Sequence, residues 1–362
     1  MLLRTTLLHE ARNISNSNNT LVRDSLRLLR ERLPPGWRLS DPKLGLRSSR
    51  MDSIAEISSP DRRTGSIVLE ARARIDPKSV SFLVEAKHTA RSRGALVVFA
   101  PYLSEATRTR LREGEIGYLD LTGNVRIVMP EPGLYIETRG ASEDPDRKER
   151  PSRSLRGVKA GRIVRAIIDR KEVPGVRELA ALTKVDAGYV SRVLKFLDTE
   201  ALVTRVGRGR MQSVDWTALL RRWAQEAPLE SRGDIRTYLE PRGLSAIVAR
   251  LAKSDERYLV TASLACSAIA PTTPARLATV WVCDAVEAAA RLALRSTDAG
   301  ANVLLIEPGD TGVFEGAAQR DGVWYAAPSQ VAADLLTSPG RGPAEGEELI
   351  TWMQANEDRW RI

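Results

Sequence analysis

Residues 58–87 read SSPDRRTGSIVLEARARIDPKSVSFLVEAK, and this stretch sets the architecture of the first part of the chain. MDSIAEIS (51–58) alternates apolar and polar side chains, PDRRTG (60–65) supplies turn residues, and SIVLEARARI (66–75) alternates again. That order predicts a β-hairpin. Asp76-Pro77 then offers a capping carboxylate followed by proline at the first helical position. We therefore expect a helix of roughly fifteen residues after the hairpin.

The segments on either side complete one α/β unit. TLVRDSLRLLRERL (20–33) spaces its leucines as a helix does, and GALVVFAPYL (94–103) is an apolar run typical of a strand buried on both faces. SEATRTRLREG (104–114) reads as a capped helix, and IGYLDLTGNVRIVMP and GLYIETRG supply further strands. The order predicts a compact α/β domain in residues 1–140. Residues 141–157 are charged, lack periodicity and form the expected linker.

The opening stretch contains two glutamate-x-basic triplets that could belong to a metal-dependent nuclease. In such a site two acidic groups hold Mg²⁺, and the basic residue stands two positions after the glutamate on a strand. Residues i and i+2 share one face of a strand but point about 200° apart on a helix. Glu85 and Lys87 fall in the predicted helix, whereas Glu70 and Arg72 fall on the predicted strand. Asp61 falls in the turn, so the predicted constellation is Asp52, at the head of the preceding strand, with Glu70 and Arg72.

In this order of elements, residues 20–140 resemble the restriction-endonuclease-like fold, particularly Mrr-type members of the PD-(D/E)xK class. The resemblance implies Mg²⁺ bound by Asp52 and Glu70. Arg72 departs from the family's lysine, because arginine stays protonated and cannot act as a base. We therefore expect a non-catalytic domain without a cofactor. The alternative is a Mg²⁺-dependent DNA endonuclease in which Arg72 binds a phosphate. Asp120 and Asn124 could line the same cleft, although a bend between strands is the favoured interpretation.

A second pattern begins near residue 158. The pattern predicts three helices, in GRIVRAIIDRK, GVRELAALT and AGYVSRVLKFLDTEAL, and Asp186 caps the third. It then predicts two short strands around Gly207 and Gly209, in VTRVGRGRMQSVDW. Residues 158–225 resemble the winged helix-turn-helix of bacterial transcription regulators. The expected core joins apolar residues of the second and third helices: Val176, Leu179, Ala180, Leu182, Val190, Val193, Leu194 and Leu197.

The polar residues of this segment are the candidate DNA-binding groups. On the third helix Arg192 is the candidate for a guanine contact, Tyr189 and Ser191 for bases or phosphates, and Lys195 for a phosphate. The expected wing carries Arg205, Arg208 and Arg210. Residues 151–225 hold 16 Lys/Arg against 7 Asp/Glu, which favours a polyanionic partner.

Residues 234–362 alternate helical and strand-like stretches and hold an excess of acid. They are similar to the C-terminal region of AbiEi-type antitoxins and regulators, which is related to nucleotidyltransferases. Active members of that group use a Gly-Ser turn and paired strand carboxylates for metal. Here Ala262-Ser263 and the single Asp284 stand in those places, so we expect a catalytically silent domain. Its acidity favours a protein partner or dimerisation over contact with DNA.

The composition argues against a zinc-binding, membrane-spanning or secreted protein. The 362 residues carry a formal charge of +9, two histidines and two cysteines. Cys266 and Cys283 stand apart without a CxxC, so we expect two buried thiols and no structural zinc. No apolar run is long enough for a membrane span, and the start lacks the apolar core of a signal peptide. We expect a cytoplasmic, nucleoid-associated homodimer that binds double-stranded DNA as an antitoxin-like transcription regulator. A scaffold for a protein complex on DNA is a third possibility.

Overall fold

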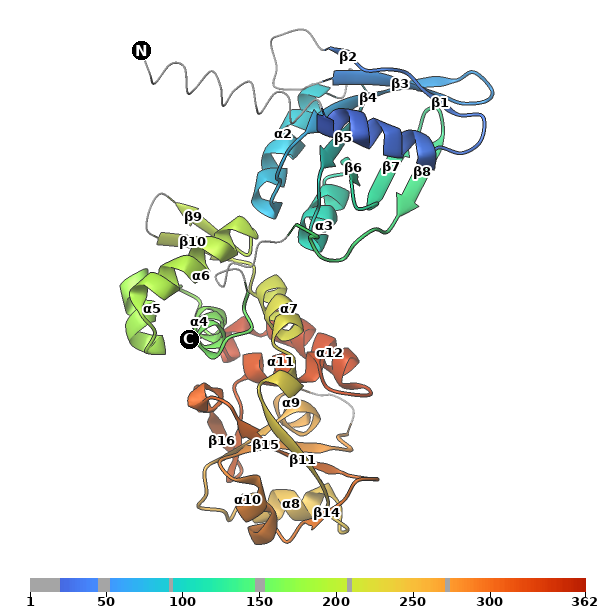
Figure 1. Cartoon of the computed structure of the whole chain (residues 1–362). Coiled ribbons are helices and arrows are strands. Elements are labelled where there is room, and N and C mark those ends of the chain that lie inside the picture. Colours follow the sequence, from blue (N-terminus) through green and yellow to red (C-terminus); the bar gives the residue numbers. More distant parts are fainter. Residues whose placement is uncertain (1–19, 45–52, 91–93, 147–153, 207–209, 271–273) are drawn as a thin grey trace. The chain divides into compact units, whose positions relative to one another are not determined.

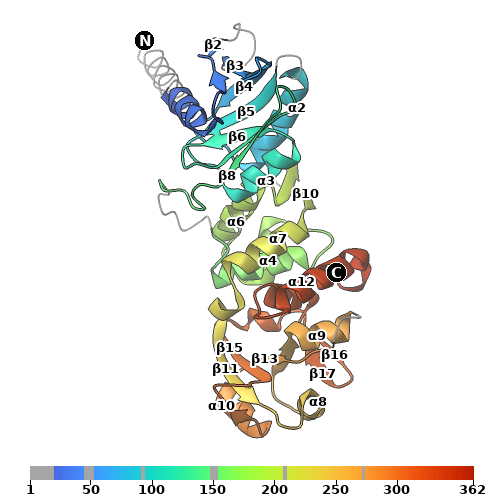
Figure 2. The same ribbon diagram turned by 90° about the vertical axis from the view of Figure 1, so that its right-hand side faces the viewer.

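A computed structural model describes residues 20–44, 53–90, 94–146, 154–206, 210–270 and 274–362. The chain divides into two compact units. One comprises residues 1–149 with the turn 199–201, and the other comprises residues 150–198 and 202–362. Both units mix helices with sheets, so the chain is a multidomain α/β protein (Figures 1 and 2).

The first unit is built on one mixed sheet with the strand order β1-β3-β4-β5-β6-β7-β8, while β2 pairs with β3. Helical residues 20–32 pack on one face through Leu21, Leu26 and Leu29, and α2 and α3 pack on the other through Val80, Leu83 and Leu111. The strands are β1 Arg38–Leu39, β2 Lys43–Leu44, β3 Ser53–Ser58, β4 Thr64–Ala71, β5 Ala95–Ala100, β6 Gly117–Asp120, β7 Val125–Met129 and β8 Leu134–Thr138. The helices are η1 Pro77–Ser79, α2 Val80–Ala90 and α3 Glu105–Glu113.

Local sequence signals account for most of these boundaries. β3 and β4 pair antiparallel from Ser53↔Leu69 to Ser58↔Thr64, which confirms the predicted hairpin. The Asp76 carboxylate accepts a hydrogen bond from the Ser79 amide at 2.9 Å, and Ser104 caps α3. One boundary was wrong, because β4 ends at Ala71 instead of continuing to Ile75. Beyond Ala71 the chain leaves the sheet to enter the turn that Asp76-Pro77 requires.

The second unit begins with three helices and a hairpin. α4 (Val158–Ile168), α5 (Val176–Thr183) and α6 (Ala187–Thr199) precede the antiparallel strands β9 (Val203–Val206) and β10 (Arg210–Val214). α7 (Trp216–Glu226) follows and packs against α4. Apolar residues on one side of each helix form a common core, so the predicted order of helices and strands is confirmed.

The rest of the second unit is a mixed sheet with the strand order β14-β11-β15-β13-β12-β17-β16. Its central strands β12, β13 and β15 are apolar and largely buried, and α9, α11 and α12 pack together beside them. The strands are β11 Gly233–Leu239, β12 Tyr258–Thr261, β13 Ala278–Val282, β14 Arg295–Ser296, β15 Val303–Pro308, β16 Ala318–Arg320 and β17 Val323–Tyr325. The helices are η2 Leu229–Ser231, α8 Leu244–Leu251, α9 Ala262–Ile269, α10 Ala285–Arg291, η3 Thr311–Phe314, α11 Pro328–Leu336, α12 Gly342–Ala355 and η4 Glu357–Arg359.

Two burial predictions for this unit were wrong. Leu182 is 47% exposed, and Thr183 takes the buried position at the end of α5. Positions 182 and 183 lie three and four residues after the buried Leu179, so either could face the core; the core takes Thr183, whose hydroxyl donates to the Leu179 carbonyl at 2.6 Å. Cys266 is buried as expected, but Cys283 is exposed because it follows the last residue of the buried strand β13.

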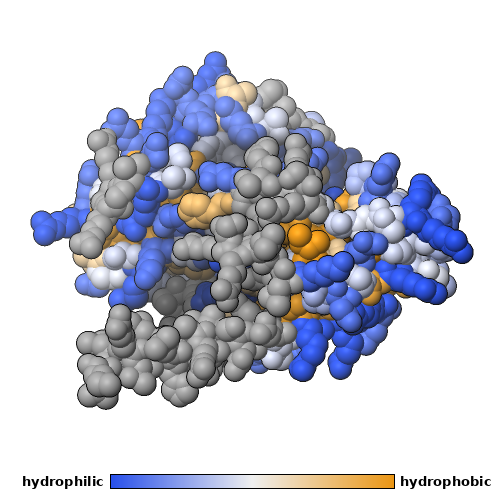
Figure 3. Space-filling model, turned by 90° about the horizontal axis from the view of Figure 1, so that it is seen from above, coloured by the Kyte–Doolittle hydropathy of each residue, from blue (hydrophilic) through white to orange (hydrophobic). Residues whose placement is uncertain are grey.

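The surface seen in Figure 3 is mostly hydrophilic, and its hydrophobic patches are small and separate. No helix among the described residues is long and apolar enough to cross a membrane.

Candidate functional site

The position of α6 is fixed at its start by a short turn and along its length by an apolar stripe. Lys184 adopts the left-handed conformation (φ 54°, ψ 38°) at the end of α5, which redirects the chain within three residues. The Asp186 carboxylate then accepts a hydrogen bond from the Tyr189 amide at 3.1 Å, as expected of an N-cap. Four side chains at helical spacing are buried: Val190, Val193, Leu194 and Leu197. Together these contacts determine which face of α6 remains outside.

The outward face of α6 carries polar and basic groups. Ser191, Arg192 and Lys195 are exposed, and Tyr189 is half-buried. The guanidinium carbon of Arg192 lies 5.5 Å from the centroid of the Tyr189 ring, within the range of a cation–π contact. This contact limits the rotamers of a long side chain at the N-terminal half of the helix. The result is an exposed cation with a defined orientation.

The hairpin after α6 contributes one described basic side chain. Arg205 lies on β9 opposite Met211 and is partly buried, and its Nε has no hydrogen-bond partner among the residues described. Arg208 lies outside the described residues, and for Arg210 only the backbone, at the start of β10, is described. Of the three predicted wing arginines, only Arg205 can therefore be located by its side chain.

In the first unit, Glu70 and Arg72 are close together. The Arg72 guanidinium lies 2.5 Å from Oε1 of Glu70, which is buried at 3% exposure. The Arg72 amide donates to the Phe99 carbonyl at 2.8 Å, so its backbone still follows β5 although the strand has ended. The Arg72 side chain is 45% exposed. The pair thus joins a buried carboxylate to a cation that solvent can reach.

This pair does not fit a metal site by itself. No group of three His, Cys, Asp or Glu residues gathers anywhere in the described chain in a way that could hold an ion. Asp52, the third member of the predicted constellation, lies outside the described residues. Glu85 and Lys87 are on α2 as expected, and Lys87 Nζ donates to the Gly114 carbonyl and to Glu115 at 3.0 Å each.

Asp120 and Asn124 form a buried turn between β6 and β7. Asp120 Oδ1 accepts from the amides of Thr122 and Asn124 at 3.0 Å and from the Thr122 hydroxyl at 2.7 Å. Its Oδ2 accepts from the Leu103 amide at 3.0 Å and from Asn124 Nδ2 at 2.9 Å. Both residues are fully buried. These bonds occupy the acceptor capacity of the carboxylate, so its role here is structural.

Ala262 and Asp284, the two positions compared in the sequence with a nucleotidyltransferase site, serve local structure. Ala262, with φ 51°, begins α9, and Asp284 caps α10 by accepting from the Glu287 amide at 2.8 Å. Asp284 is exposed, and its use as a helix cap accounts for its position.

Sequence reasoning missed the buried charges of the second unit. Arg165, on α4, is 6% exposed, and Asp334, on α11, is fully buried. Each interrupts an apolar helical stripe, which is the signal that could have identified them. Comparison with known protein families, characterised proteins and solved structures gives no significant match for this chain.

Proposed function

We propose that the protein is a regulator that binds double-stranded DNA through α6. The observation that carries the proposal is the division of α6 into a buried apolar stripe and an exposed face with Ser191, Arg192 and Lys195. A helix with this division can enter the major groove while its buried side stays on the supporting helices. The excess of Lys/Arg in residues 151–225 supports a polyanionic partner.

In this proposal the segment from α4 to β10 is a winged helix-turn-helix. The first unit is a restriction-endonuclease-like domain without catalysis, and the remainder of the second unit is an inactive nucleotidyltransferase-like domain. The resemblance of residues 234–362 to AbiEi-type proteins supports the proposal that the protein is an antitoxin-like repressor of the cytoplasm and nucleoid. The acidic residues 226–362, with 13 Lys/Arg and 19 Asp/Glu, are suited to a protein partner or to a second copy of the chain.

Selection of duplexes from a random pool, followed by gel shifts, tests the proposal. We expect one preferred sequence, with binding that weakens as salt rises. Arg192→Ala should reduce affinity for that sequence by about 1–3 kcal/mol, the usual worth of a specific base contact. Arg295→Ala is the matched control, because Arg295 is an exposed arginine on β14, outside the α4–β10 segment. Equal affinity of wild type and R192A would refute the assignment of α6.

A second candidate is a Mg²⁺-dependent DNA endonuclease, for which Glu70 would supply one of the two metal-binding acids, with Asp52 as the other, and Arg72 would bind a phosphate. A buried carboxylate beside a half-exposed guanidinium is suited to holding a phosphate next to an acid. Incubation of supercoiled DNA with Mg²⁺ or Mn²⁺ tests it. Nicking that disappears in Glu70→Ala and in Asp52→Ala would establish the enzyme, and intact DNA under both metals would exclude it.

A further inference from the structure

The second unit contains a cavity of about 410 Å³ that is partly open to solvent. Its wall is formed by α4, the end of α5, α7, the segment from Gly309 to Gly316 and the start of α11. A volume of this size falls in the range of small-molecule sites in proteins. Three consecutive residues of the wall are Leu182 and Thr183, which end α5, and its C-cap Lys184, from which the chain turns into α6.

The wall is rich in cations. Its side chains include three carboxylates, from Asp169, Asp310 and Glu315, and six cations, from Arg156, Arg162, Arg165, Arg170, Lys184 and Arg232. Arg162 and Asp310 neutralise each other, with Nε–Oδ1 at 2.9 Å. Asp169 lies beside Arg165, with its Oδ2 3.7 Å from Nη2; burial raises the pKa of this carboxyl and Arg165 opposes the change. Six cations against three carboxylates leave an excess of positive charge in the wall, which favours a negatively charged occupant.

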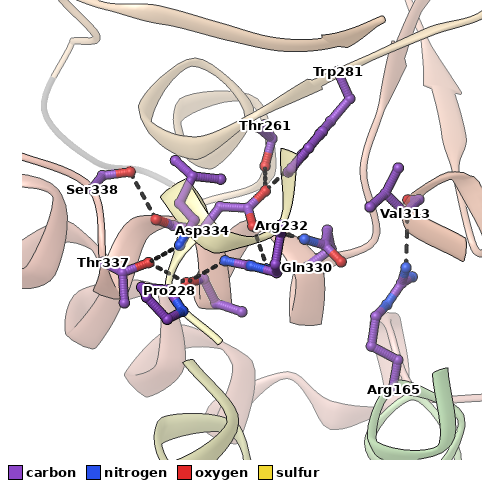
Figure 4. Close-up of polar contacts among 12 residues, drawn as sticks. Arg165, Pro228, Arg232, Thr261, Trp281, Val313, Gln330, Asp334, Thr337 and Ser338 are labelled. Carbon is purple, nitrogen blue, oxygen red and sulfur yellow. Dashed lines mark hydrogen bonds and ion pairs between the residues drawn. The ribbon is translucent and has the colours of Figure 1, made fainter. Parts of the chain in front are cut away.

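Two of these arginines are held in place from behind. Arg232 lies 2.8 Å from Oδ1 of Asp334, and its guanidinium carbon lies 5.2 Å from the centroid of the Trp223 ring. Figure 4 shows Asp334 at the centre of these contacts, with Thr261 and Trp281 donating to its other oxygen at 2.6 and 3.0 Å. The arrangement fixes Arg232 without filling the cavity.

Arg165 is fixed by the loop across from α4. Its Nη1 donates to the Gly312 carbonyl at 2.7 Å and its Nη2 to the Glu315 carbonyl at 2.5 Å. The Nε groups of Arg165 and Arg232 are buried without a hydrogen-bond partner within the described part of the chain. A buried donor without a partner costs about 1–3 kcal/mol.

The cavity also has an aromatic and apolar side. Trp223 and Trp360 contribute to its wall, and so do Leu182 and Val158, which are 47% and 48% exposed. Apolar side chains left half exposed around a cavity are typical of a binding site, because an occupant removes them from water. Cations and aromatic rings lie side by side in this wall, since Arg232 lies over the Trp223 ring, and together they define the chemistry of the occupant.

We propose that this cavity binds a small aromatic organic anion and that binding fixes residues 182–184, from which the chain turns into α6. The anionic group faces Arg165 and Arg232, and the aromatic body packs against Trp223 and Trp360. Arg162 connects the two regions, since it pairs with Asp310 and also donates to the Thr183 carbonyl at 3.4 Å. The claim that occupancy of the cavity regulates DNA affinity rests on the proposed function. The claims that the anion binds and that it fixes residues 182–184 do not.

The test uses two fluorescent probes that differ in one group. 8-Anilinonaphthalene-1-sulfonate carries an anionic sulfonate, and N-phenyl-1-naphthylamine is its uncharged analogue. We expect one sulfonate probe per chain and binding of the neutral probe at least about tenfold weaker, a difference of about 1.4 kcal/mol. Equal affinities, or several weak sites, would overturn the anion site. Val286→Ser removes an exposed valine of α10 that does not line the cavity, and it should leave binding unchanged.

Two kinds of variant connect binding to the cavity. Ala166→Leu adds volume to the wall and should weaken sulfonate binding at least about tenfold with unchanged circular dichroism. Leu182 is half exposed, so both of its variants should fold: Leu182→Glu should weaken binding and Leu182→Lys should not. Wild-type binding by both Ala166→Leu and Leu182→Glu would overturn the location.

Hydrogen exchange tests the coupling without DNA. The amides of residues 182–186 should exchange more slowly when the sulfonate probe is bound, and unchanged exchange would overturn the effect on the turn. DNA titrations with and without probe then address regulation alone. Absence of DNA binding would refute the proposed function. The probe and hydrogen-exchange results would still show whether the cavity binds an anion and whether binding affects residues 182–184.

Discussion

Replacement of Asp334 by alanine should destabilise the second unit strongly. The carboxylate is fully buried, pairs with Arg232 at 2.8 Å and accepts from Thr261, Trp281 and Gln330 at 2.6, 3.0 and 2.7 Å. Its removal leaves a buried guanidinium without its counter-charge, which costs about 3–5 kcal/mol. Typical domain stabilities are about 5–15 kcal/mol, so the loss is a large fraction of the total.

Urea denaturation followed by tryptophan fluorescence measures this effect, since six of the seven tryptophans lie in the second unit. With an m-value near 3 kcal/mol per molar urea, the midpoint should fall by about 1–2 M. Asp334→Asn keeps one carbonyl acceptor and should fall between wild type and alanine. Asp298→Ala, at an exposed bend, is the control and should change stability by less than about 0.5 kcal/mol. A midpoint for Asp334→Ala equal to that control would refute the reasoning.

Asp310→Asn should cost about 1–3 kcal/mol at neutral pH through the weakened Arg162 pair. Burial alone would raise the pKa of Asp310, but hydrogen bonds from Arg162 and the Gly312 amide lower it. Because the folded pKa is the lower one, the stabilisation exists above the unfolded value of about 3.9 and is lost as pH falls through the folded pKa. Melting curves should therefore converge for wild type and variant in acid, and a constant difference would contradict this. Lys195→Ala should lower the affinity for all duplexes alike and reduce the slope of log K against log salt by about one. Binding to a panel of duplex sequences measures this. A change in sequence preference would contradict a phosphate contact. Asp120→Ala should lower the melting temperature of the first unit by several degrees, since five donors lose their acceptor; an unchanged melting curve would contradict the structural role.

Local patterns predicted local structure well. The hairpin before Glu70, the Asp76-Pro77 helix start and the Asp186 cap all depend on neighbours within a few residues, and each is present. The placement of Glu85 and Lys87 on a helix followed from the same reasoning. Elements defined by turn residues and caps can therefore be predicted from the sequence alone.

Features that depend on distant contacts could not be predicted. Arg165 donates to carbonyls 147 and 150 residues further along the chain, and no spacing rule connects them. The exposure of Leu182 has the same origin, because the cavity it borders is formed by segments that meet only in the folded unit. The cavity could for that reason not be predicted from the sequence, although a charged residue within an apolar helical stripe could have identified Arg165 as a buried charge.

The most direct test of the central claim is the affinity of a selected duplex for wild type and Arg192→Ala across a salt series, measured by fluorescence anisotropy. We expect a linear decrease of log K with log salt for both proteins. We also expect the variant to lose about 1–3 kcal/mol on the selected duplex and much less on an unrelated one. Equal loss on both duplexes, or none on either, would contradict the claim that α6 reads DNA.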